Sequence, residues 1–486
     1  MTYKRILLIN IIAHEDSRPV TQAVLRAGLG YLAQALKDRG VEYAVLDMGL
    51  GYPQERIGEA AGTFKPDLIA VTLFTYRYTQ AYERLRALRS EFPSIPIVCG
   101  GPHVSTFQEK VLEECEAVDF ALMREAEETL PGLCGGAAPK DIPGLLYREN
   151  GSVRRSGAAY CPPDIDKLSF PRYSGFELEH YPARNTPAAE RMIPIVTSRG
   201  CPYECVYCPV QTTIGKRFRP RQVAGVIAEF VHWHRAGYRT FSIIDDNFTL
   251  IRERVVEFCA ALKRENLAGI SISLPNGIRA DKVDRELLEL MRASGFRHLG
   301  IGVESGNDAV LAGLKKSETI ATIGKAVDEA CRAGFSVDLF FLVGSPGETA
   351  REVEDSIAFV REHPVDKVFF FNLIPYPGTE LFGWVKEHGR LLYPPEHYLT
   401  HISSSMDTPV FETPEFPAAE RLRALRRARR EVGLTRVRYY ERVLRGRSWP
   451  GLLASAAARI YGFEFLQRLM NDVPALKALK SRWRDR

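Results

Sequence analysis

Two hydrophobic patterns alternate along the first 140 residues. Short, nearly uninterrupted apolar runs predict buried strands, and apolar residues that recur every three or four positions predict helices. The apolar runs lie at 5–12, 42–46, 68–73, 96–99 and 120–123, and the helical patterns lie at 27–39 and 80–91. Strands that alternate with helices form parallel sheets, and strands that are apolar on both faces suit a sheet covered on both sides. We therefore predict an α/β, Rossmann-like (flavodoxin-like) domain over residues 1–140.

The same alternation returns over residues 191–395. Predicted strands lie at 193–197, 240–244, 271–274, 298–303, 336–342 and 367–373, and predicted helices at 221–236, 252–265, 285–294, 320–333 and 350–362. Six strand-and-helix units predict an open, partial (β/α)6 barrel rather than a closed eight-stranded one. Polar and glycine-rich residues follow the strands, on the face where such barrels build their sites.

The remaining segments carry weaker patterns. Asn150-Gly151 predicts a short hairpin within residues 141–190, but such a long irregular connection favours a linker between two domains. Residues 396–486 predict a helical, basic C-terminal domain, because residues 421–447 hold eleven arginines and two glutamates at helical spacing. Three interpretations stay open for it: helices packed on the barrel, a membrane-surface helix, or a lid over an anionic substrate. The aromatic residues form no stacking platform, so we expect no nucleic-acid partner.

Composition narrows the class of protein. The chain has 486 residues, 45% hydrophobic and 26% charged, with a formal net charge of +5. These values are ordinary for a globular protein of two or three domains. An odd number of cysteines, nine, argues against a secreted disulfide scaffold. No apolar run is long enough to span a bilayer. We predict a cytoplasmic protein that can touch a membrane peripherally through its basic C-terminus.

Three cysteines form the most specific motif in the sequence. Cys201, Cys205 and Cys208 follow the first strand of the barrel and the segment Ser198-Arg199-Gly200. Thiolates bind iron–sulfur clusters or zinc, and three of them leave one metal position open to a substrate or cofactor. The alternative is a zinc site with a fourth ligand from elsewhere, but a second Cys-x-x-Cys half does not occur.

Candidate ligand contacts follow several predicted strands, where parallel sheets bind their ligands. They are Thr75, Gly100, Gly101, Pro102, Glu125 and Glu127 in the first domain, and Asp246, Asn247, Asn276, Arg279 and Glu304 in the barrel. The two glycines either let backbone approach a ligand or only shape a turn. The first strand is not followed by G-x-G-x-x-G, which disfavours a dinucleotide.

The cysteine motif and its place after the first barrel strand strongly resemble the radical SAM superfamily over residues 193–385. The resemblance implies that Cys201, Cys205 and Cys208 ligate three irons of a [4Fe–4S] cluster. The amino and carboxylate groups of S-adenosylmethionine would chelate the fourth iron. This family reduces the cluster, cleaves S-adenosylmethionine and forms a 5′-deoxyadenosyl radical.

The same resemblance assigns roles around the rim of the barrel. Tyr207 is expected against the adenine, and Glu304 at the ribose hydroxyls. Asp246 and Asn247 are expected at the methionine amino group or nearby polar atoms, with Asn276 and Arg279 as weaker candidates. For each of these residues the alternative is a polar loop end or a helix cap.

The first domain is similar to the cobalamin-binding domain that precedes many radical SAM enzymes. The resemblance lies in Gly100-Gly101-Pro102-His103-Val104 and in Glu125-Ala126-Glu127-Glu128-Thr129, although the family's first glycine is Arg124 here. It implies that Thr75, Gly100, Gly101, Pro102, Glu125 and Glu127 bind cobalamin. The Asp-x-His-x-x-Gly pattern of cobalamin mutases is missing from the sequence, so the lower base is expected to be detached, with no histidine on cobalt and no such role for His103.

Together the two halves resemble a cobalamin-dependent radical SAM enzyme. We predict a methyltransferase that moves a methyl group from methylcobalamin to an unactivated carbon of a small-molecule or lipid substrate. A reductant such as flavodoxin or ferredoxin is the expected partner, and the ends of the N-terminal strands are expected to face the barrel mouth. Two alternatives stay open: a cyclase or rearrangement enzyme of the same branch, and a non-catalytic iron–sulfur or cobalamin sensor. Gly344–Thr349 and Pro375–Thr379 also resemble segments of this branch, and for Glu348 we expect a structural role.

Overall fold

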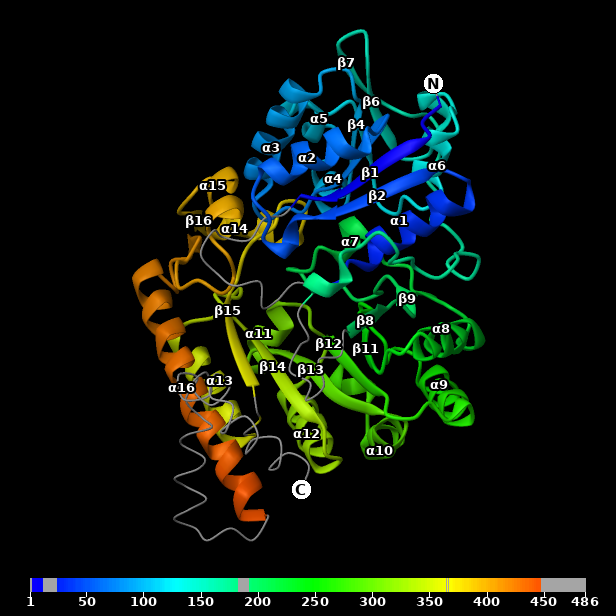
Figure 1. Ribbon diagram of the computed structural model, residues 1–486. Coiled ribbons are helices and arrows are strands. Elements are labelled where there is room, and N and C mark those ends of the chain that lie inside the picture. The colour runs from blue at the N-terminus through cyan, green and yellow to red at the C-terminus, as the bar shows by residue number, and fades with distance from the viewer. Residues whose placement is uncertain (1, 12–23, 182–191, 364, 366, 447–486) are drawn as a thin grey trace.

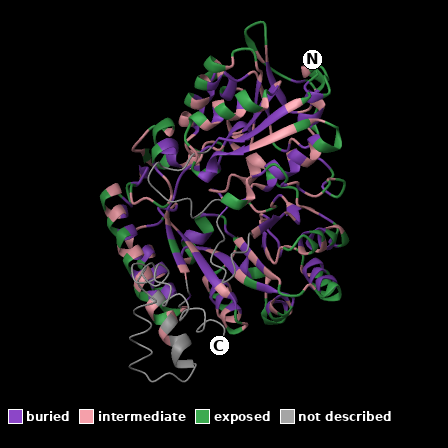
Figure 2. Ribbon diagram, viewed as in Figure 1, coloured by how far each residue is buried: buried purple, intermediate pink, exposed green. Residues whose placement is uncertain are grey.

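A computed structural model describes residues 2–11, 24–181, 192–363, 365 and 367–446 (Figure 1). Two sheets, one above the other in this view, dominate the fold. Buried residues concentrate on the strands and on the helix faces that cover them (Figure 2). Among the described residues, no helix is long and apolar enough to cross a membrane.

The first sheet has seven strands in the order β2-β1-β3-β4-β5-β6-β7. Five are parallel: β1 Arg5–Asn10, β2 Glu42–Asp47, β3 Leu68–Thr72, β4 Ile97–Gly100 and β5 Phe120–Leu122. The helices between them are α1 Ala27–Asp38, α2 Glu55–Phe64, α3 Tyr78–Glu91, α4 Pro102–Phe107 and α5 Lys110–Glu114, and α6 Thr129–Cys134 follows β5. The predicted flavodoxin-like α/β architecture is confirmed.

The predicted hairpin belongs to this sheet and not to a linker. β6 Leu145–Glu149 pairs antiparallel with β5, and β7 Ser152–Arg155 pairs with β6. Leu145 and Leu146 are fully buried in this position, so the hairpin covers an edge of β5 that would otherwise expose backbone groups. The first domain therefore extends past residue 140. Farther along, Tyr173 packs beneath Gly30 of α1 and against Trp233 of the barrel, so this part of the predicted linker is packed between the domains.

The second sheet has six parallel strands in the order β15-β14-β13-β12-β11-β8. They are β8 Met192–Ile195, β11 Thr240–Ile243, β12 Ser271–Ile278, β13 Phe296–Glu304, β14 Ser336–Val343 and β15 Lys367–Asn372. Their helices are α8 Val223–Arg235, α9 Arg252–Glu265, α10 Arg285–Ala293, α12 Ile320–Arg332 and α13 Ala350–Glu362. The edge strands β8 and β15 do not pair in the described part of the chain, so the predicted open barrel is confirmed.

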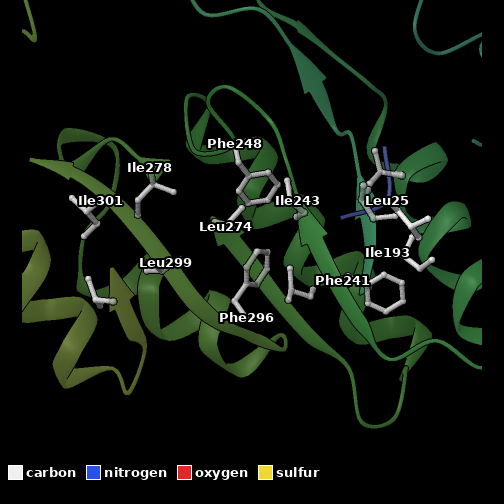
Figure 3. Packing of buried hydrophobic residues seen from close by; sticks show 14 of the residues in the cluster. Leu25, Ile193, Phe241, Ile243, Phe248, Leu274, Ile278, Phe296, Leu299 and Ile301 are labelled. Atoms are coloured by element: carbon white, nitrogen blue, oxygen red, sulfur yellow. The ribbon is translucent and has the colours of Figure 1, made fainter. Parts of the chain in front are cut away.

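Apolar side chains from the strands interlock between this sheet and its helices (Figure 3). Phe241, Phe248 and Phe296 lie close to Ile243 and Leu274, and all are buried. The rings of Phe248 and Phe296 are 5.6 Å apart. Each buried aromatic side chain removes a large apolar area from water and so stabilises the packing of the strands against the helices. This packing holds in place the strand ends that carry the polar residues.

The C-terminal region joins both domains. α14 Glu380–His388 precedes α15 Pro395–His401, which packs against α3 of the first domain through a Thr79–Thr400 hydroxyl contact of 2.8 Å. The 29-residue α16 Ala418–Gly446 packs along α13 and β15 and buries Leu425 and Ala428. The helical C-terminal extension is thus confirmed over 418–446, whereas residues 447–486 lie outside the described part.

Candidate functional site

The cysteine loop leaves β9 Ser198–Arg199, which pairs antiparallel with β10 Arg219–Pro220. Gly200 turns the chain with φ of +88°, and a side chain there would collide with the carbonyl of Arg217. Only glycine meets both requirements. The Cys208 N–H then donates to the Cys205 carbonyl at 3.1 Å, and the short helix α7 Val210–Thr213 closes the loop.

The three thiols of the loop fit the predicted cluster. Cys201, Cys205 and Cys208 are free and partly exposed. Burial and, to a smaller extent, the neighbouring Cys205 and Cys201 raise the pKa of Cys208 to about 12. All three thiols lie on one loop of eight residues. Among the described residues, no three His, Cys, Asp or Glu side chains are close enough for a single metal ion. In an iron–sulfur cluster each cysteine binds a different iron.

Asp246 and Asn247, directly after β11, lie at the base of this loop. The Gly200 N–H donates to Asp246 Oδ2 at 3.0 Å, so Asp246 holds the turn into Cys201. Asn247 is 1% exposed, and neither amide atom has a hydrogen-bond partner among the described residues. Buried polar groups without a partner are uncommon and costly. Burial raises the pKa of the Cys201 thiol, and the nearby Asn247 side chain offsets a small part of this shift. Its free amide suits a polar ligand at the predicted S-adenosylmethionine position.

Glu304 lies at the end of β13 and is paired with a lysine that sequence reasoning missed. Lys316 Nζ is 3.2 Å from Glu304 Oε1 and 3.4 Å from Glu318 Oε2, and the lysine side chain is 8% exposed. Both atoms of the first pair lie over Gly302, where a side chain would collide with them. Burial raises the pKa of Tyr207, and the Glu304 carboxylate raises it further. The structure therefore brings together Tyr207 and Glu304, both predicted to contact S-adenosylmethionine.

Arg279 and Asn276 are engaged within the protein. The Arg279 guanidinium lies 3.6 Å from the centre of the Tyr203 ring in the cysteine loop. It also donates to the carbonyls of Lys316 at 2.8 Å and Ser317 at 3.0 Å. Asn276 Nδ2 donates to the Ile244 carbonyl at 2.8 Å. Both residues hold parts of the rim together, and direct contact with a cofactor stays a prediction for them.

Glu125 and Glu127 are taken up by contacts with the barrel. Arg199 Nη1 is 2.5 Å from Glu125 Oε2, and Arg199 Nη2 is 2.7 Å from Glu127 Oε1. Arg219, which lies opposite Arg199 in the β9–β10 pair, also forms an ion pair with Glu125. We call Glu125, Glu127, Arg199 and Arg219 the interdomain ion-pair cluster. Their side chains are 4%, 6%, 11% and 11% exposed.

This cluster gives Glu125 and Glu127 a role between the domains, and because Glu127 Oε2 has no hydrogen-bond partner among the described residues, their contact with cobalamin stays a prediction. Two arginines side by side repel each other, and burial lowers the pKa of Arg199, but the two carboxylates raise it above its ordinary value. Buried charges need such partners. Because Arg199 precedes Gly200 and Cys201, the carboxylates fix the cysteine loop relative to the first domain.

The glycine turn after β4 leads into a helix that contacts the end of the cysteine loop. Gly101 has φ of +100°, and a side chain there would lie 2.8 Å from the Leu73 carbonyl. Gly101 thus shapes the turn from Gly100 into Pro102. α4, which begins at Pro102, contacts α7 beyond Cys208. The cobalamin role stays a prediction for Gly100, Gly101, Pro102 and the 9%-exposed Thr75.

The side chains of His103 and Glu348 are both buried and bound by other groups of the protein. The Tyr82 hydroxyl is 2.8 Å from His103 Nε2, and the imidazole is fully buried against Tyr78 and Phe107. Burial lowers the pKa of His103 to about 3. Glu348 accepts hydrogen bonds from the N–H groups of Gly344 at 2.5 Å and Ser345 at 3.0 Å, which confirms its structural role.

Comparison with known proteins agrees with both halves of the fold. The Radical SAM superfamily matches residues 195–360, and the B12 binding domain matches residues 20–134. An uncharacterized methyltransferase of Pyrococcus horikoshii is 29% identical over 75% of this chain and 79% of its own length. The cytidylyl-2-hydroxyethylphosphonate methyltransferase of Streptomyces wedmorensis is 25% identical over 78% of this chain and 81% of its own. An anaerobic magnesium-protoporphyrin IX monomethyl ester cyclase of Cereibacter sphaeroides is 25% identical over 79% of this chain and 64% of its own length.

Among solved structures, the radical S-adenosylmethionine methyltransferase TsrM from Kitasatospora setae, with cobalamin and a [4Fe–4S] cluster bound, has the same fold. Its TM-score is 0.65 and its sequence identity is 21%, and the match covers 80% of this chain and 75% of TsrM. Fold and site therefore define an enzyme with a cobalamin-binding domain in front of a radical SAM barrel. Residues 20–134 thus match a B12 binding domain and residues 195–360 match the Radical SAM superfamily, and the cofactors of these two domains are cobalamin, a [4Fe–4S] cluster and S-adenosylmethionine.

Proposed function

We propose that this enzyme transfers a methyl group from methylcobalamin to an unactivated carbon of a small-molecule or lipid substrate. The observation that carries the proposal is the meeting of the two domains at the cysteine loop. The loops after β4 and β5 of the first sheet contact the segments that flank this loop: α4 contacts α7, and the interdomain ion-pair cluster holds Arg199. Ligands bind at these strand ends in both kinds of domain, so a methyl donor on one domain faces a radical source on the other.

The protein's own residues supply position and exclusion of water. When bound, the three cofactors supply the electron, the radical precursor and the methyl group. Cys201, Cys205 and Cys208 would hold the cluster, and Asp246 fixes the turn that leads into them. The Glu304–Lys316 pair presents a carboxylate of fixed orientation beside Tyr207. Such buried, pre-oriented groups hold reactive cofactors without rearrangement during the reaction.

Product stoichiometry tests the proposal. The holoenzyme is reconstituted without oxygen and given S-adenosylmethionine, a reductant such as flavodoxin or ferredoxin, and an extract containing substrate. We expect 5′-deoxyadenosine and S-adenosylhomocysteine to form in a ratio near one to one. 5′-Deoxyadenosine without S-adenosylhomocysteine would favour cyclisation or rearrangement, the reaction class of the cyclase from Cereibacter sphaeroides. If neither product forms, the methyltransferase proposal fails.

A cytoplasmic enzyme with peripheral membrane contact is a separate proposal, supported by the basic C-terminal sequence. Along α16, several arginines already pair within the protein: Arg429 with Asp407, and Arg427 and Arg438 with Glu431. The exposed Arg423 and Arg430 of α16, together with the basic residues beyond residue 446, are therefore the candidates for a membrane contact. A chain that ends at residue 446 should float less than the full chain with vesicles that contain anionic lipid, and the difference should shrink as the salt concentration rises. Equal flotation of both chains, or no flotation of either, would refute a contact through the residues beyond 446.

A further inference from the structure

Three phenylalanine rings form a wall on β14 and β15. Phe340 lies 5.6 Å from Phe369 and 6.2 Å from Phe371, measured between ring centres. The rings of Phe369 and Phe371 are 5.8 Å apart and within 2° of parallel. We call these three residues the phenylalanine wall.

The wall occupies the face of the sheet that turns away from the helices. Successive residues of a strand point to opposite faces. Phe341 and Phe370, which alternate with the wall residues, are buried, and Phe341 packs on Phe359 of α13. The wall is more open: Phe369 is 36% exposed, and Phe340 and Phe371 are only partly buried. Apolar side chains that are exposed next to one another often mark a binding site.

The same face continues from the wall to the cofactor rim. On β13, Gly300 and Gly302 lie beside the wall, and both lack side chains for a reason. A side chain at Gly300 would come within 2.8 Å of the Phe340 ring, and one at Gly302 would meet the Glu304–Lys316 pair. Two residues of a strand span about 7 Å. The position beside Phe340 and the position beside the Glu304 carboxylate are therefore about 7 Å apart along β13. Glu304 is the residue expected to contact S-adenosylmethionine.

A polar pair bounds the wall at its other end. His298 Nε2 of β13 is 3.0 Å from Asp338 Oδ2 of β14, and their side chains are 22% and 11% exposed. Asp338 precedes Phe340 by two residues and so lies on the same face. The apolar surface is thus confined between this pair and the cofactor rim.

We propose that the phenylalanine wall binds a flat, conjugated or aromatic part of the substrate and holds it beside the radical source. This inference names a substrate class for the proposed function and rests on it. Aromatic rings prefer offset-stacked or edge-to-face partners and gain about 0.5–1.5 kcal/mol per pair beyond the area they bury. A flexible alkyl chain gains only the burial. The wall therefore selects planar over aliphatic substrates.

Binding of two matched probes to the holoenzyme tests the inference. 2-Naphthoate is flat, and decanoate is a flexible carboxylate of similar size. By calorimetry under anaerobic conditions we expect 2-naphthoate to bind more tightly than decanoate by about 5-fold or more. Phe369→Leu, which keeps apolar area but removes the ring, should weaken 2-naphthoate by about 3- to 10-fold and leave decanoate unchanged. Leu434→Ala, on the 49%-exposed Leu434 of α16, is the control and should alter neither.

Several outcomes would overturn the inference. They are equal affinity of the two probes, an unchanged 2-naphthoate affinity in Phe369→Leu, and no binding of either probe. A self-association of the chain that Phe369→Leu abolishes would assign the wall to a second copy and also overturn it. Because binding is measured apart from turnover, loss of methyl transfer with intact Phe369-dependent binding would refute only the proposed function.

Discussion

Replacing Glu125 by glutamine tests whether the interdomain ion-pair cluster fixes the cysteine loop. The Glu125 carboxylate is 4% exposed and lies against both Arg199 and Arg219. Its neutralisation leaves two buried guanidinium groups with the single carboxylate of Glu127. Breaking a buried ion pair by removing one partner costs about 3–5 kcal/mol. Because glutamine keeps some hydrogen bonding, we take about 3 kcal/mol, which corresponds to a change of about 150-fold in the open population of the loop.

Amide hydrogen exchange measures that population directly. In Glu125→Gln, amide exchange in residues 196–209 should quicken by about 100-fold. Cobalamin affinity should stay within about 3-fold of the wild type, because the Glu125 carboxylate is bound by protein partners. Glu128→Gln, at an exposed neighbour, is the matched control and should change neither quantity. An Arg199→Met variant should be non-additive with Glu125→Gln, since both remove the same interaction. A fall in cobalamin affinity with unchanged exchange of the loop would refute the reasoning and return Glu125 to the cobalamin site.

Three further predictions concern the rim and the C-terminal helix. Cys205→Ala should abolish cluster absorbance and 5′-deoxyadenosine formation together, and cleavage of S-adenosylmethionine without Cys205 would contradict the cluster assignment. Lys316→Met leaves Glu304 without its buried cation, whereas Glu318 keeps Arg279 at 3.9 Å. S-adenosylmethionine affinity should therefore fall by about 10- to 100-fold, with Lys315→Met as the control; equal affinities in the two variants would contradict it. Burial raises the pKa of Glu348 from 4.5 to about 7. The protonated carboxyl therefore stabilises the folded protein fully below about pH 4.5, and this stabilisation is lost as the pH rises through about 7. Protection of the Gly344–Glu348 turn from hydrogen exchange should therefore fall between pH 5 and 8 in the wild type but not in Glu348→Gln, and parallel profiles would contradict the assignment.

The regular elements could be predicted because their signals are local. The six barrel strands follow from apolar runs, and helices such as Arg252–Glu265 follow from apolar spacing. The hairpin at Asn150-Gly151 could also be predicted from local sequence. Its pairing with β5 could not, because it depends on β5 being at the edge of the parallel strands in the folded sheet. Its placement in a linker was therefore wrong.

The site could be predicted only where chemistry is tied to a motif. The cysteine spacing identifies the cluster loop. Glu125 is different, because its partners Arg199 and Arg219 lie 74 and 94 residues away, and a strand-end glutamate alone suits a ligand contact equally well. Lys316 escaped notice because consecutive lysines usually indicate a solvated surface. Its burial depends on Glu304 and Glu318, which only the folded chain brings to it.

The fate of a labelled methyl group tests whether cobalamin carries the methyl group to the substrate. The holoenzyme is incubated without oxygen with reductant, substrate extract and S-adenosylmethionine that carries a trideuterated methyl group. We expect the label to pass first to cobalamin and then, with all three deuterons, to a carbon of the product, with one 5′-deoxyadenosine formed per methyl transferred. Deuterium that never reaches cobalamin, or a product that carries no label while 5′-deoxyadenosine accumulates, would contradict this expectation.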